Sequence, residues 1–166
     1  NWPDVDRIHR LLITQEGLPG RPDGEFNNIV ARGYEPIKQY FSGQYEKLSR
    51  VSSMYSDIRI SEDEEVSENL YFVDPDYADI FRMEEVQGSL ASALSAPGRI
   101  ALEEGLASRL TEKVQIGERL QLTSSAGAEM EFEVAAIYRL PELITPQTRV
   151  NMLSLIDDSA LPFFTS

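Results

Sequence analysis

The stretch from residue 69 to residue 139 constrains the fold most, because strand and helix patterns alternate there between well-marked turns. Strands are expected at 69–73, 99–102, 118–123 and from 130 onward, and short helices are expected after residues 74, 89 and 103. The last two strands flank a turn that contains Gly127, which predicts a hairpin. Short helices interleaved with strands predict a mixed α+β fold.

The first strand of this stretch has two apolar faces. Leu70 and Phe72 alternate with Tyr71 and Val73, which predicts contacts on both sides of a sheet. A short helix is expected next, with Asp74 as its cap and Pro75 as its first residue. One apolar face of that helix is predicted to hold Tyr77, Ile80 and Phe81.

The second half of the stretch follows the same logic. Glu103 and Glu104 precede a helix, where acidic groups favour the positive end of the helix dipole. The buried stripe of that helix is predicted to comprise Leu106, Ala107 and Leu110. Gly117 turns the chain into the hairpin. In the returning strand Met130, Phe132 and Val134 alternate with glutamates, so one face is expected to be buried.

The flanks carry weaker patterns. We expect a strand at 7–14 buried on both faces, a loop at 16–25, a helix at 37–41 with Pro36 in its first position, and a helix end that gives way to a strand near Ser49. The acidic turn 61–68 would join that strand to the one at 69–73 as a hairpin. After a linker at 141–146, a strand at 149–153 is expected to enter the same sheet as 7–14.

Composition excludes several classes of function. The 166 residues suggest one domain or two small subdomains. The net charge of −13 disfavours a nucleic-acid partner and charge-driven docking on anionic lipid. The chain has no cysteine, which excludes disulfides, a thiol nucleophile and a cysteine-ligated zinc. No apolar run approaches the roughly 20 residues that span a bilayer, and no signal-peptide pattern is present.

Isolated polar residues offer little chemistry. His9 is the only histidine and stands on a charged stretch, which favours a solvated or structural role. The acidic turn lacks the D-x-D-x-D-G ligand spacing and the glycine of a calcium loop. A solvated hairpin tip is therefore favoured over a calcium site in a surface binding module. The acidic residues of the turn are Glu62, Asp63, Glu64, Glu65 and Glu68.

No catalytic or phosphate-binding motif is present. Glu103-Glu104 beside Arg109 and the pair Asp157-Asp158 are better explained by helix-terminus and turn electrostatics. The remaining alternative is a hydrolase in which Glu103 and Asp157 act as a carboxylate pair within about 10 Å. The spacing of Gly98, Gly105 and Gly117 matches no phosphate loop, and Ser124-Ser125 before Gly127 is a plain turn. We therefore expect no catalytic residue, no cofactor and no metal.

Six pieces in order nevertheless resemble a known family. They are D-P-x-aromatic-x-x-Ile-Phe (74–81), Gly88, Ile100-Ala101-Leu102, Leu106-Ala107-x-x-Leu110, Ile116-Gly117-x-x-Leu120 and Phe132-x-Val134-x-x-Ile137. This order resembles the periplasmic core domain of MacB/FtsX-type ABC transporter permeases. The opening Trp2-Pro3-Asp4-Val5-Asp6-Arg7-Ile8-His9-Arg10 resembles the segment after the first membrane helix in that family. Thr111 stands where the family often has an aromatic, and Ala135 or Ala136 where it often has glycine.

The resemblance implies an architecture and a role. Residues 74–140 would form a small inserted α/β subdomain, and residues 1–73 with 141–166 a porter-like one. The chain would be a non-catalytic module outside the membrane, in the periplasm at the bacterial inner membrane. It would couple the permease's own membrane helices, and through them an ABC ATPase on another chain or region, to a periplasmic partner or exported substrate. A dimer is implied in the full transporter, with membrane helices before Asn1 and after Ser166.

Overall fold

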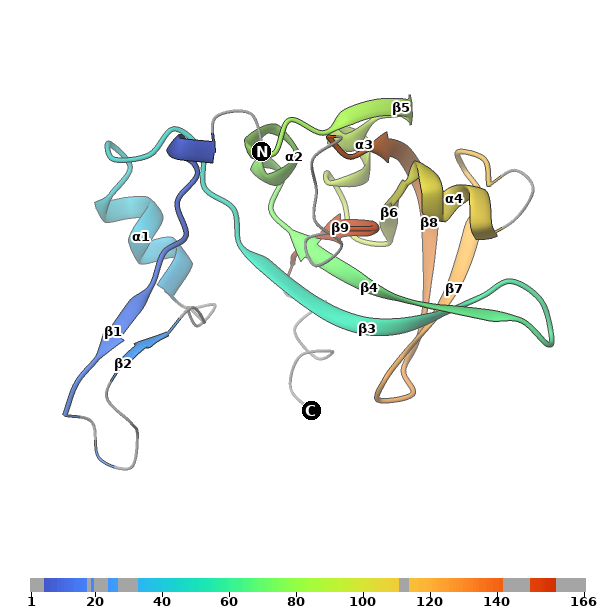
Figure 1. Cartoon of the computed structure of the whole chain (residues 1–166), viewed down its shortest axis with the longest axis horizontal. Helices are drawn as coiled ribbons and strands as arrows, with labels where there is room; N and C mark the ends of the chain where they lie inside the picture. Colours follow the sequence, from blue (N-terminus) through green and yellow to red (C-terminus); the bar gives the residue numbers. More distant parts are fainter. Residues whose placement is uncertain are drawn as a thin grey trace. The chain divides into compact units, whose positions relative to one another are not determined.

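The computed structural model describes residues 5–17, 19, 24–26, 33–110, 114–141 and 150–157. The chain forms two compact units. The N-terminal unit is Pro3–Leu48, and the ring unit is Ser49–Ser166 together with Asn1–Trp2. Figure 1 shows the elements of both units. None of the helices among the described residues is long and apolar enough to cross a membrane.

The N-terminal unit consists of short elements. They are the 3-10 helix η1 (Val5–Arg7), the strands β1 (Ile13–Gln15) and β2 (Gly24–Phe26), and the helix α1 (Tyr34–Tyr40). β1 and β2 pair antiparallel as a two-stranded sheet. α1 buries none of its side chains. The expected strand at 7–14 is thus only three residues long, and Leu11 and Leu12 before it are exposed.

The ring unit is built on a seven-stranded sheet of described residues. Its strands are β3 (Val51–Arg59), β4 (Glu65–Val73), β5 (Glu84–Gly88), β6 (Arg99–Glu103), β7 (Arg119–Ser124), β8 (Glu129–Arg139) and β9 (Met152–Leu155). The strand order is β5-β8-β6-β9-β4-β3-β7. β7 also pairs with β8, so the strands from β8 through β6, β9, β4 and β3 to β7 close into a ring. Closure removes free edges from most of the sheet.

One hydrophobic cluster fills the ring, and every strand of the ring contributes to it. Its fully buried members include Ile58, Leu70, Ile100, Leu102, Leu122, Val134 and Met152. Helix α4 (Glu104–Leu110) adds the predicted stripe of Leu106, Ala107 and Leu110 to this inner cluster. At roughly 25 cal/mol per Å² of apolar area, such burial is the main stabilising term of the unit.

A second cluster lies on the outer face of β4, β6, β8 and β9. Val73, Ala101 and Leu153 point outward there, under the helices α2 (Asp76–Ile80) and α3 (Leu90–Ala93). β4 therefore has two apolar faces, as its alternating pattern predicted, with Leu70 and Phe72 inside and Val73 outside. The predicted helices after residues 74, 89 and 103 are confirmed as α2, α3 and α4.

A β-bulge in β8 explains its two adjacent buried alanines. The β6–β8 register steps from Ile100 opposite Val134 to Ala101 opposite Ala136, so Ala135 is the extra residue. A bulge re-aims the side chains that follow it. Val134 and Ile137 thus belong to the inner cluster, whereas Ala135 and Ala136 belong to the outer one.

The predicted subdomain boundaries at 73/74 and 140/141 are wrong with respect to the sheet. Strands β5, β6, β7 and β8 from residues 74–140 share one sheet with β3, β4 and β9 from the flanks. The chain divides into its two compact units after Leu48 instead. The antiparallel pairings of β3 with β7 and of β6 with β9 join the segments that local patterns separated.

Other flank expectations also need correction. The strand at the C-terminal end is β9, which pairs with β4 and β6, while β1 pairs with β2, so 149–153 and 7–14 do not share a sheet. α1 starts before Pro36. The hairpin of β3 and β4 is confirmed, although β4 begins at Glu65, inside the expected turn. β5 had not been expected, because its exposed residues carry no apolar alternation.

Candidate functional site

His9 lies between η1 and β1, in a described stretch without regular structure, and its side chain is exposed. Its neighbours Leu11 and Leu12 are exposed as well, so no buried pocket surrounds the ring of His9. General-base catalysis requires a reacting group or an orienting partner within hydrogen-bond reach. The position of His9 is that of a solvated side chain.

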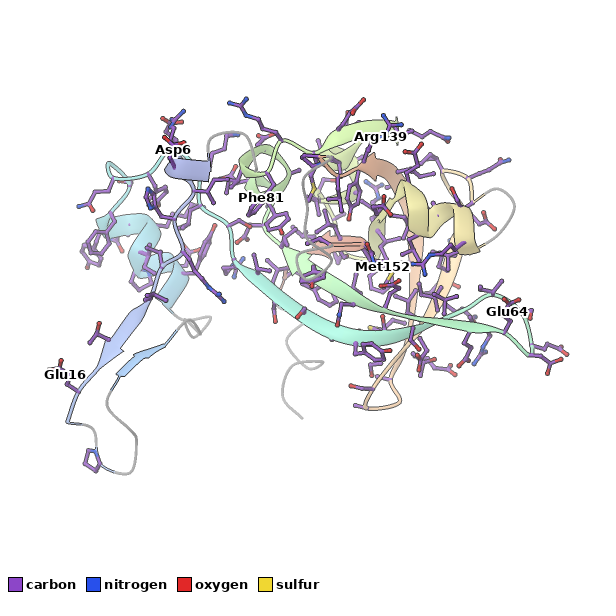
Figure 2. The ribbon with its side chains drawn as sticks, in the orientation of Figure 1. Asp6, Glu16, Glu64, Phe81, Arg139 and Met152 are labelled. Carbon is purple, nitrogen blue, oxygen red and sulfur yellow. The ribbon has the colours of Figure 1, made fainter. Side chains whose placement is uncertain are left out.

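The acidic residues of the turn 61–68 lie in two different settings: those at its tip are exposed, whereas the carboxylate of Glu68 has partners. At the tip, the backbone N–H groups of Ile60 and Ser61 donate to the carbonyl of Glu64, at 2.9 and 3.2 Å, and Glu64 lies at the end of the hairpin (Figure 2). Glu68 lies further along, in β4, where its carboxylate accepts hydrogen bonds from Arg109 at 2.5 Å and from the amide of Asn151 at 2.8 Å. Within the described residues, no three His, Asp or Glu side chains are arranged to hold a metal.

Glu103 and Glu104 have different partners. The Glu103 carboxylate accepts from the backbone N–H of Leu106 at 3.1 Å, which confirms its predicted role at the start of α4. Glu104 pairs with Arg139 at 2.9 Å rather than with Arg109. The hydrogen bond from Arg139 lowers the pKa of the Glu104 carboxyl, and the same bond raises the pKa of Arg139. These are surface interactions that hold α4 to β8.

The carboxylate pair of the hydrolase hypothesis is separated along the sheet. The N–H of Glu103 donates to the carbonyl of Asn151 at 2.8 Å, and β9 runs away from this point antiparallel to β6. At about 3.3 Å per residue, Asp157 lies roughly 20 Å further along the extended chain. A carboxylate pair for hydrolysis needs a separation of about 10 Å or less. Asp158 lies outside the described residues.

The glycines and serines singled out from the sequence also serve the fold. Gly98 and Gly117 have φ values of +76° and +90° in separate turns, while Gly105 is part of α4. The hydroxyl of Ser124 accepts from the N–H of Ala128 at 3.0 Å and closes the β7–β8 turn. These residues form no common loop that could cradle a phosphate.

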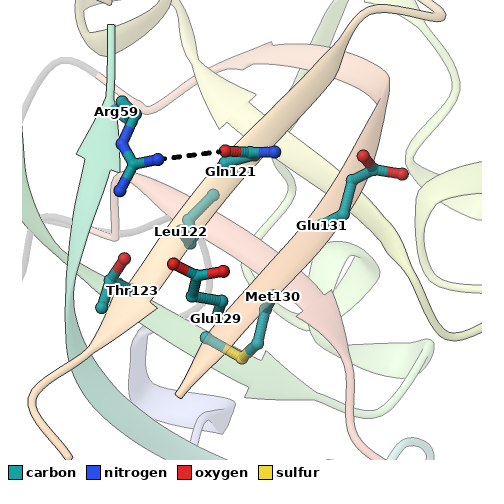
Figure 3. A pocket seen from close by; sticks show the side chains of 7 residues that line it. All are labelled: Arg59, Gln121, Leu122, Thr123, Glu129, Met130 and Glu131. Carbon is teal, nitrogen blue, oxygen red and sulfur yellow. Dashed lines mark hydrogen bonds between the residues drawn. The ribbon is translucent and has the colours of Figure 1, made fainter. Parts of the chain in front are cut away.

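A hollow lies where β3 meets the β7–β8 hairpin (Figure 3). It is lined by Arg59, Gln121, Leu122, Thr123, Glu129, Met130 and Glu131. Arg59 donates to the side-chain oxygen of Gln121 at 3.4 Å, and Arg119 pairs with Glu131 at 2.6 Å. Its volume of about 170 Å³ is below the 300–1,000 Å³ that is usual for small-molecule sites. The hollow therefore does not define a ligand site.

Two buried phenols are structural. Tyr138 is fully buried and its hydroxyl donates to the carbonyl of Val150, while Tyr77 is 6% exposed. Burial raises the pKa of both hydroxyls above the ordinary value for tyrosine. Both therefore stay protonated at neutral pH, as members of the outer cluster.

Asp74 does not cap α2 as predicted. The N-cap of α2 is Pro75, without a side-chain hydrogen bond, and the Asp74 carboxylate turns to Arg50 instead. The Arg50 guanidinium donates to both carboxylate oxygens, at 2.6 Å to Oδ1 and 2.9 Å to Oδ2, and the Arg50 backbone N–H donates to Oδ2 at 2.6 Å. The sequence signalled no role for Arg50, because it stands in a stretch of ambiguous pattern.

A family model for the MacB-like periplasmic core domain matches residues 5–161. The chain belongs to this family. MacB-like periplasmic core domains thus account for nearly the whole sequence, as the six resembling pieces indicated. A comparison with the curated proteins gave no match.

Two solved structures resemble this MacB-like domain. A domain assigned to a permease protein from Porphyromonas gingivalis has a TM-score of 0.59 at 17% identity, over 81% of this chain and 56% of that one. The periplasmic region of MacB from Actinobacillus actinomycetemcomitans has a TM-score of 0.56 at 14% identity, over 80% of this chain and 58% of that one. At these identities the likeness establishes the mixed α/β fold, and this chain spans somewhat more than half the length of either structure.

Many of the residues that carry the resemblance are packing residues in the MacB-like domain. Ile100, Leu106, Leu120, Phe132 and Val134 all belong to the inner cluster. Where the family often has glycine, the two alanines of β8 occupy the bulge. Thr111, the other departure, lies outside the described residues. The shared pattern therefore specifies how the ring is filled and does not specify a reactive centre.

Proposed function

We propose that this chain is the extracytoplasmic domain of a MacB/FtsX-type ABC transporter permease, at the outer face of the bacterial inner membrane. In this role it passes conformational changes between the permease's membrane helices and a periplasmic partner or exported substrate. The observation that carries the proposal is the family match over residues 5–161. ATP is hydrolysed on another chain or region, and the full transporter is a dimer.

The proposed role is non-catalytic. It is supported by the separate positions of Glu68, which pairs with Arg109, and Glu104, which pairs with Arg139. It is also supported by a ring with a continuous packed interior, because a closed and filled sheet moves as a rigid body.

The test uses the full-length gene and the transporter that it encodes. We expect a membrane helix before the segment that begins at Asn1 and further helices after Ser166. Replacing the whole domain with a Gly/Ser linker should abolish transport while the ATPase still hydrolyses ATP. The matched control is Arg119→Ala, which removes one exposed ion pair and should leave transport intact. Normal transport without the domain would overturn the proposal.

A further inference from the structure

The first half of strand β3 has one edge without a neighbouring strand among the described residues. β4 pairs with β3 along its whole length, whereas β7 pairs with it only at 56–58, where the two strands cross in Figure 1. Next to this pairing, the N–H of Ser125 in the β7–β8 turn donates to the carbonyl of Tyr55 at 3.2 Å. Residues 51–54 therefore form an open stretch of edge within the ring unit.

The hydrogen-bonding pattern shows which backbone groups face this open edge. Successive residues of a strand direct their N–H and C=O groups to opposite sides. The N–H of Ile60 donates to Glu64, on the β4 side, so the even-numbered residues of β3 face β4. The carbonyl of Tyr55 faces the β7 side. The odd-numbered Val51 and Ser53 thus direct their N–H and C=O groups to the open edge, where no described residue bonds to them.

The side chains along the open edge are uncharged, and two of them are large and exposed. From Val51 to Ser56 the sequence has no charged residue, in a chain whose net charge is −13. Val51 and Tyr55 point to the outer face of the ring and are 53% and 52% exposed. A strand added at this edge would place alternate side chains beside both of them.

Strand β5, at the end of the strand order, has an edge of the opposite kind. It is five residues long, begins with Glu84 and Glu85, and has a bulge between Glu85 and Gln87. Charged side chains, bulges and short length are the means by which proteins prevent further strands from adding to an edge. The open stretch of β3 has neither a charge nor a bulge. The contrast indicates that strand addition is prevented at β5 and used at β3.

We propose that the edge of β3 at residues 51–54 binds an extended segment of a partner protein, which pairs with it as an additional strand. The segment has apolar side chains at alternate positions and basic residues at its ends. Main-chain hydrogen bonds to Val51 and Ser53 supply affinity, and contacts with Val51 and Tyr55 select apolar side chains. The basic ends follow from the net charge of −13, which repels acidic segments. The inference rests on the proposed function only in assigning the segment to the periplasmic partner.

A second copy of this chain fits the edge less well than a short segment does. Two copies related by a two-fold axis would pair their β3 strands antiparallel. The residues before Val51 of one copy would then run beside Tyr55 of the other, on the side that Ser125 already occupies. Both copies also carry the charge of −13. A segment of another protein can end opposite Met54 and avoids both conflicts.

The experiment measures the binding of a synthetic peptide to the whole chain. In this probe, threonine alternates with valine and tyrosine, and a lysine stands at each end. A second peptide has the same sequence with methylated backbone nitrogens, which cannot donate hydrogen bonds. Binding is followed by nuclear magnetic resonance titration of the backbone amides, and amide hydrogen exchange is measured with and without the probe.

Two variants block the edge, and a third is their control. Ser53→Pro removes an N–H that faces the open edge, a position at which an edge strand tolerates proline. Val51→Lys adds a charge of the kind that protects natural edges. Because Val51 is 53% exposed, this variant preserves the test if Ser53→Pro fails to fold. Gln87→Lys adds the same charge at an exposed position of β5.

In the parent chain we expect fast exchange at the Ser53 amide and slow exchange at the Met54 amide, which faces β4, and the probe should slow exchange at Ser53. Ser53→Pro and Val51→Lys should each weaken binding by about tenfold or more. Gln87→Lys should bind the probe as the parent does, and the methylated peptide should not bind.

Three results would overturn the proposal. They are no binding to the parent at about 1 mM probe, equal binding of the methylated peptide, and unchanged binding in both edge variants. A parent chain that dimerises in sedimentation, with the dimer lost in Ser53→Pro, would assign the edge to a second copy and likewise overturn the partner segment.

The transport assay separates this proposal from the proposed function. If removing the domain abolishes transport while the probe fails to bind, the proposed function stands and the binding edge fails. If transport survives removal of the domain while the probe binds at β3, the binding edge stands and the proposed function fails.

Discussion

The two units of this chain differ in how they bury side chains. Every buried side chain among the described residues lies between Met54 and Ser154, in the ring unit. In the N-terminal unit Leu11, Leu12, Tyr40 and Phe41 are between 44% and 74% exposed. The ring unit has two apolar clusters on the two faces of one sheet, whereas α1 and the β1–β2 hairpin are held by local hydrogen bonds.

This difference implies different local stabilities. Regions with few buried apolar contacts open at low free energy, and packed sheets open only with global unfolding. The ring unit should therefore behave as the cooperative body of the domain, and the N-terminal unit as an attachment that opens more readily. Four comparisons between the units, in order of decreasing effect, test that contrast.

The largest difference should come from one leucine in each unit. Leu102→Ala empties a position of the inner cluster that is 0% exposed and should cost about 2–5 kcal/mol of unfolding free energy. Leu12→Ala removes a side chain that is already 53% exposed, so its cost should stay within about 0.5 kcal/mol. Urea denaturation of both variants measures the contrast. Equal losses would mean that the N-terminal unit has a core of its own.

The next test uses two glycines of nearly equal φ, Gly88 at +68° and Gly17 at +66°. A Cβ at Gly88 would lie 2.2 Å from the carbonyl oxygen of Ala135 and 2.9 Å from Ile116, while a Cβ at Gly17 would meet nothing within 4 Å. Gly88→Ala should therefore cost about 2–4 kcal/mol, and Gly17→Ala only the left-handed penalty of about 1 kcal/mol.

Thermal and chemical unfolding of the two glycine variants provide the measurement. The backbone conformation is matched, so the difference between the variants isolates the packed surroundings of β5 and β8. If the two costs agree, the close approach of Gly88 to Ala135 relaxes easily and the ring is softer than its burial implies.

The same contrast explains which parts of the fold were predictable. In β4 and β8 a buried face alternates with polar residues, and this local pattern identified both strands and their inward side chains, such as Phe72 and Phe132. α4 likewise followed from the spacing of Leu106 and Leu110. Where tertiary burial is strong, the sequence records it as periodicity.

Ring closure and the bulge were not predictable from local patterns. The pairing of β9 between β4 and β6 joins residues far apart in sequence, and no local signal specifies which strands meet. Ala135 is unremarkable by type, yet it is the extra residue that turns Ala136 outward. At Leu11 and Leu12 a local pattern was present but misleading, because the apolar run predicted burial and both side chains are exposed.

In the candidate site, too, local features were predictable and tertiary partners were not. The end of a helix is a local feature, and Glu103 was correctly assigned to one. The partner of Asp74 is 24 residues away, in a stretch without pattern, and the partner of Glu104 is Arg139, on β8. Carboxylates choose partners through tertiary geometry, so residue type alone could not exclude a carboxylate pair.

A smaller effect should appear at alkaline pH. Burial raises the pKa of Tyr77 and Tyr138 above the unfolded value of about 10. Below pH 10 both states hold the proton, and above it only the unfolded state releases it, so stability falls as pH rises, by up to about 1.4 kcal/mol per pH unit for each phenol.

Unfolding free energies measured between pH 9 and pH 11.5 test this slope. Tyr138→Phe should remove the contribution of one phenol from the slope of unfolding free energy against pH. It also removes the hydrogen bond to Val150, which should cost about 1 kcal/mol at neutral pH. Tyr40→Phe, at a side chain that is 74% exposed, is the matched control from the N-terminal unit. A slope unaffected by Tyr138→Phe would show that Tyr138 ionises in the folded state as it does in the unfolded one.

The smallest effect should be equal in the two units and concerns their exposed ion pairs. Arg119 and Glu131 in the ring unit are 69% and 50% exposed, and Arg7 and Glu46 in the N-terminal unit are 58% and 81% exposed. Arg119→Ala and Arg7→Ala should each change the unfolding free energy by about 0.5 kcal/mol or less, and 0.5 M salt should reduce the change further, because solvent and ions screen exposed charges. Denaturation of both variants at low and high salt provides the measurement.

Equal small costs would leave burial, rather than charge, as the cause of the contrast between the units. A distinctly larger cost at Arg7 would instead mean that ion pairs supply to the N-terminal unit the stability that packing supplies to the ring.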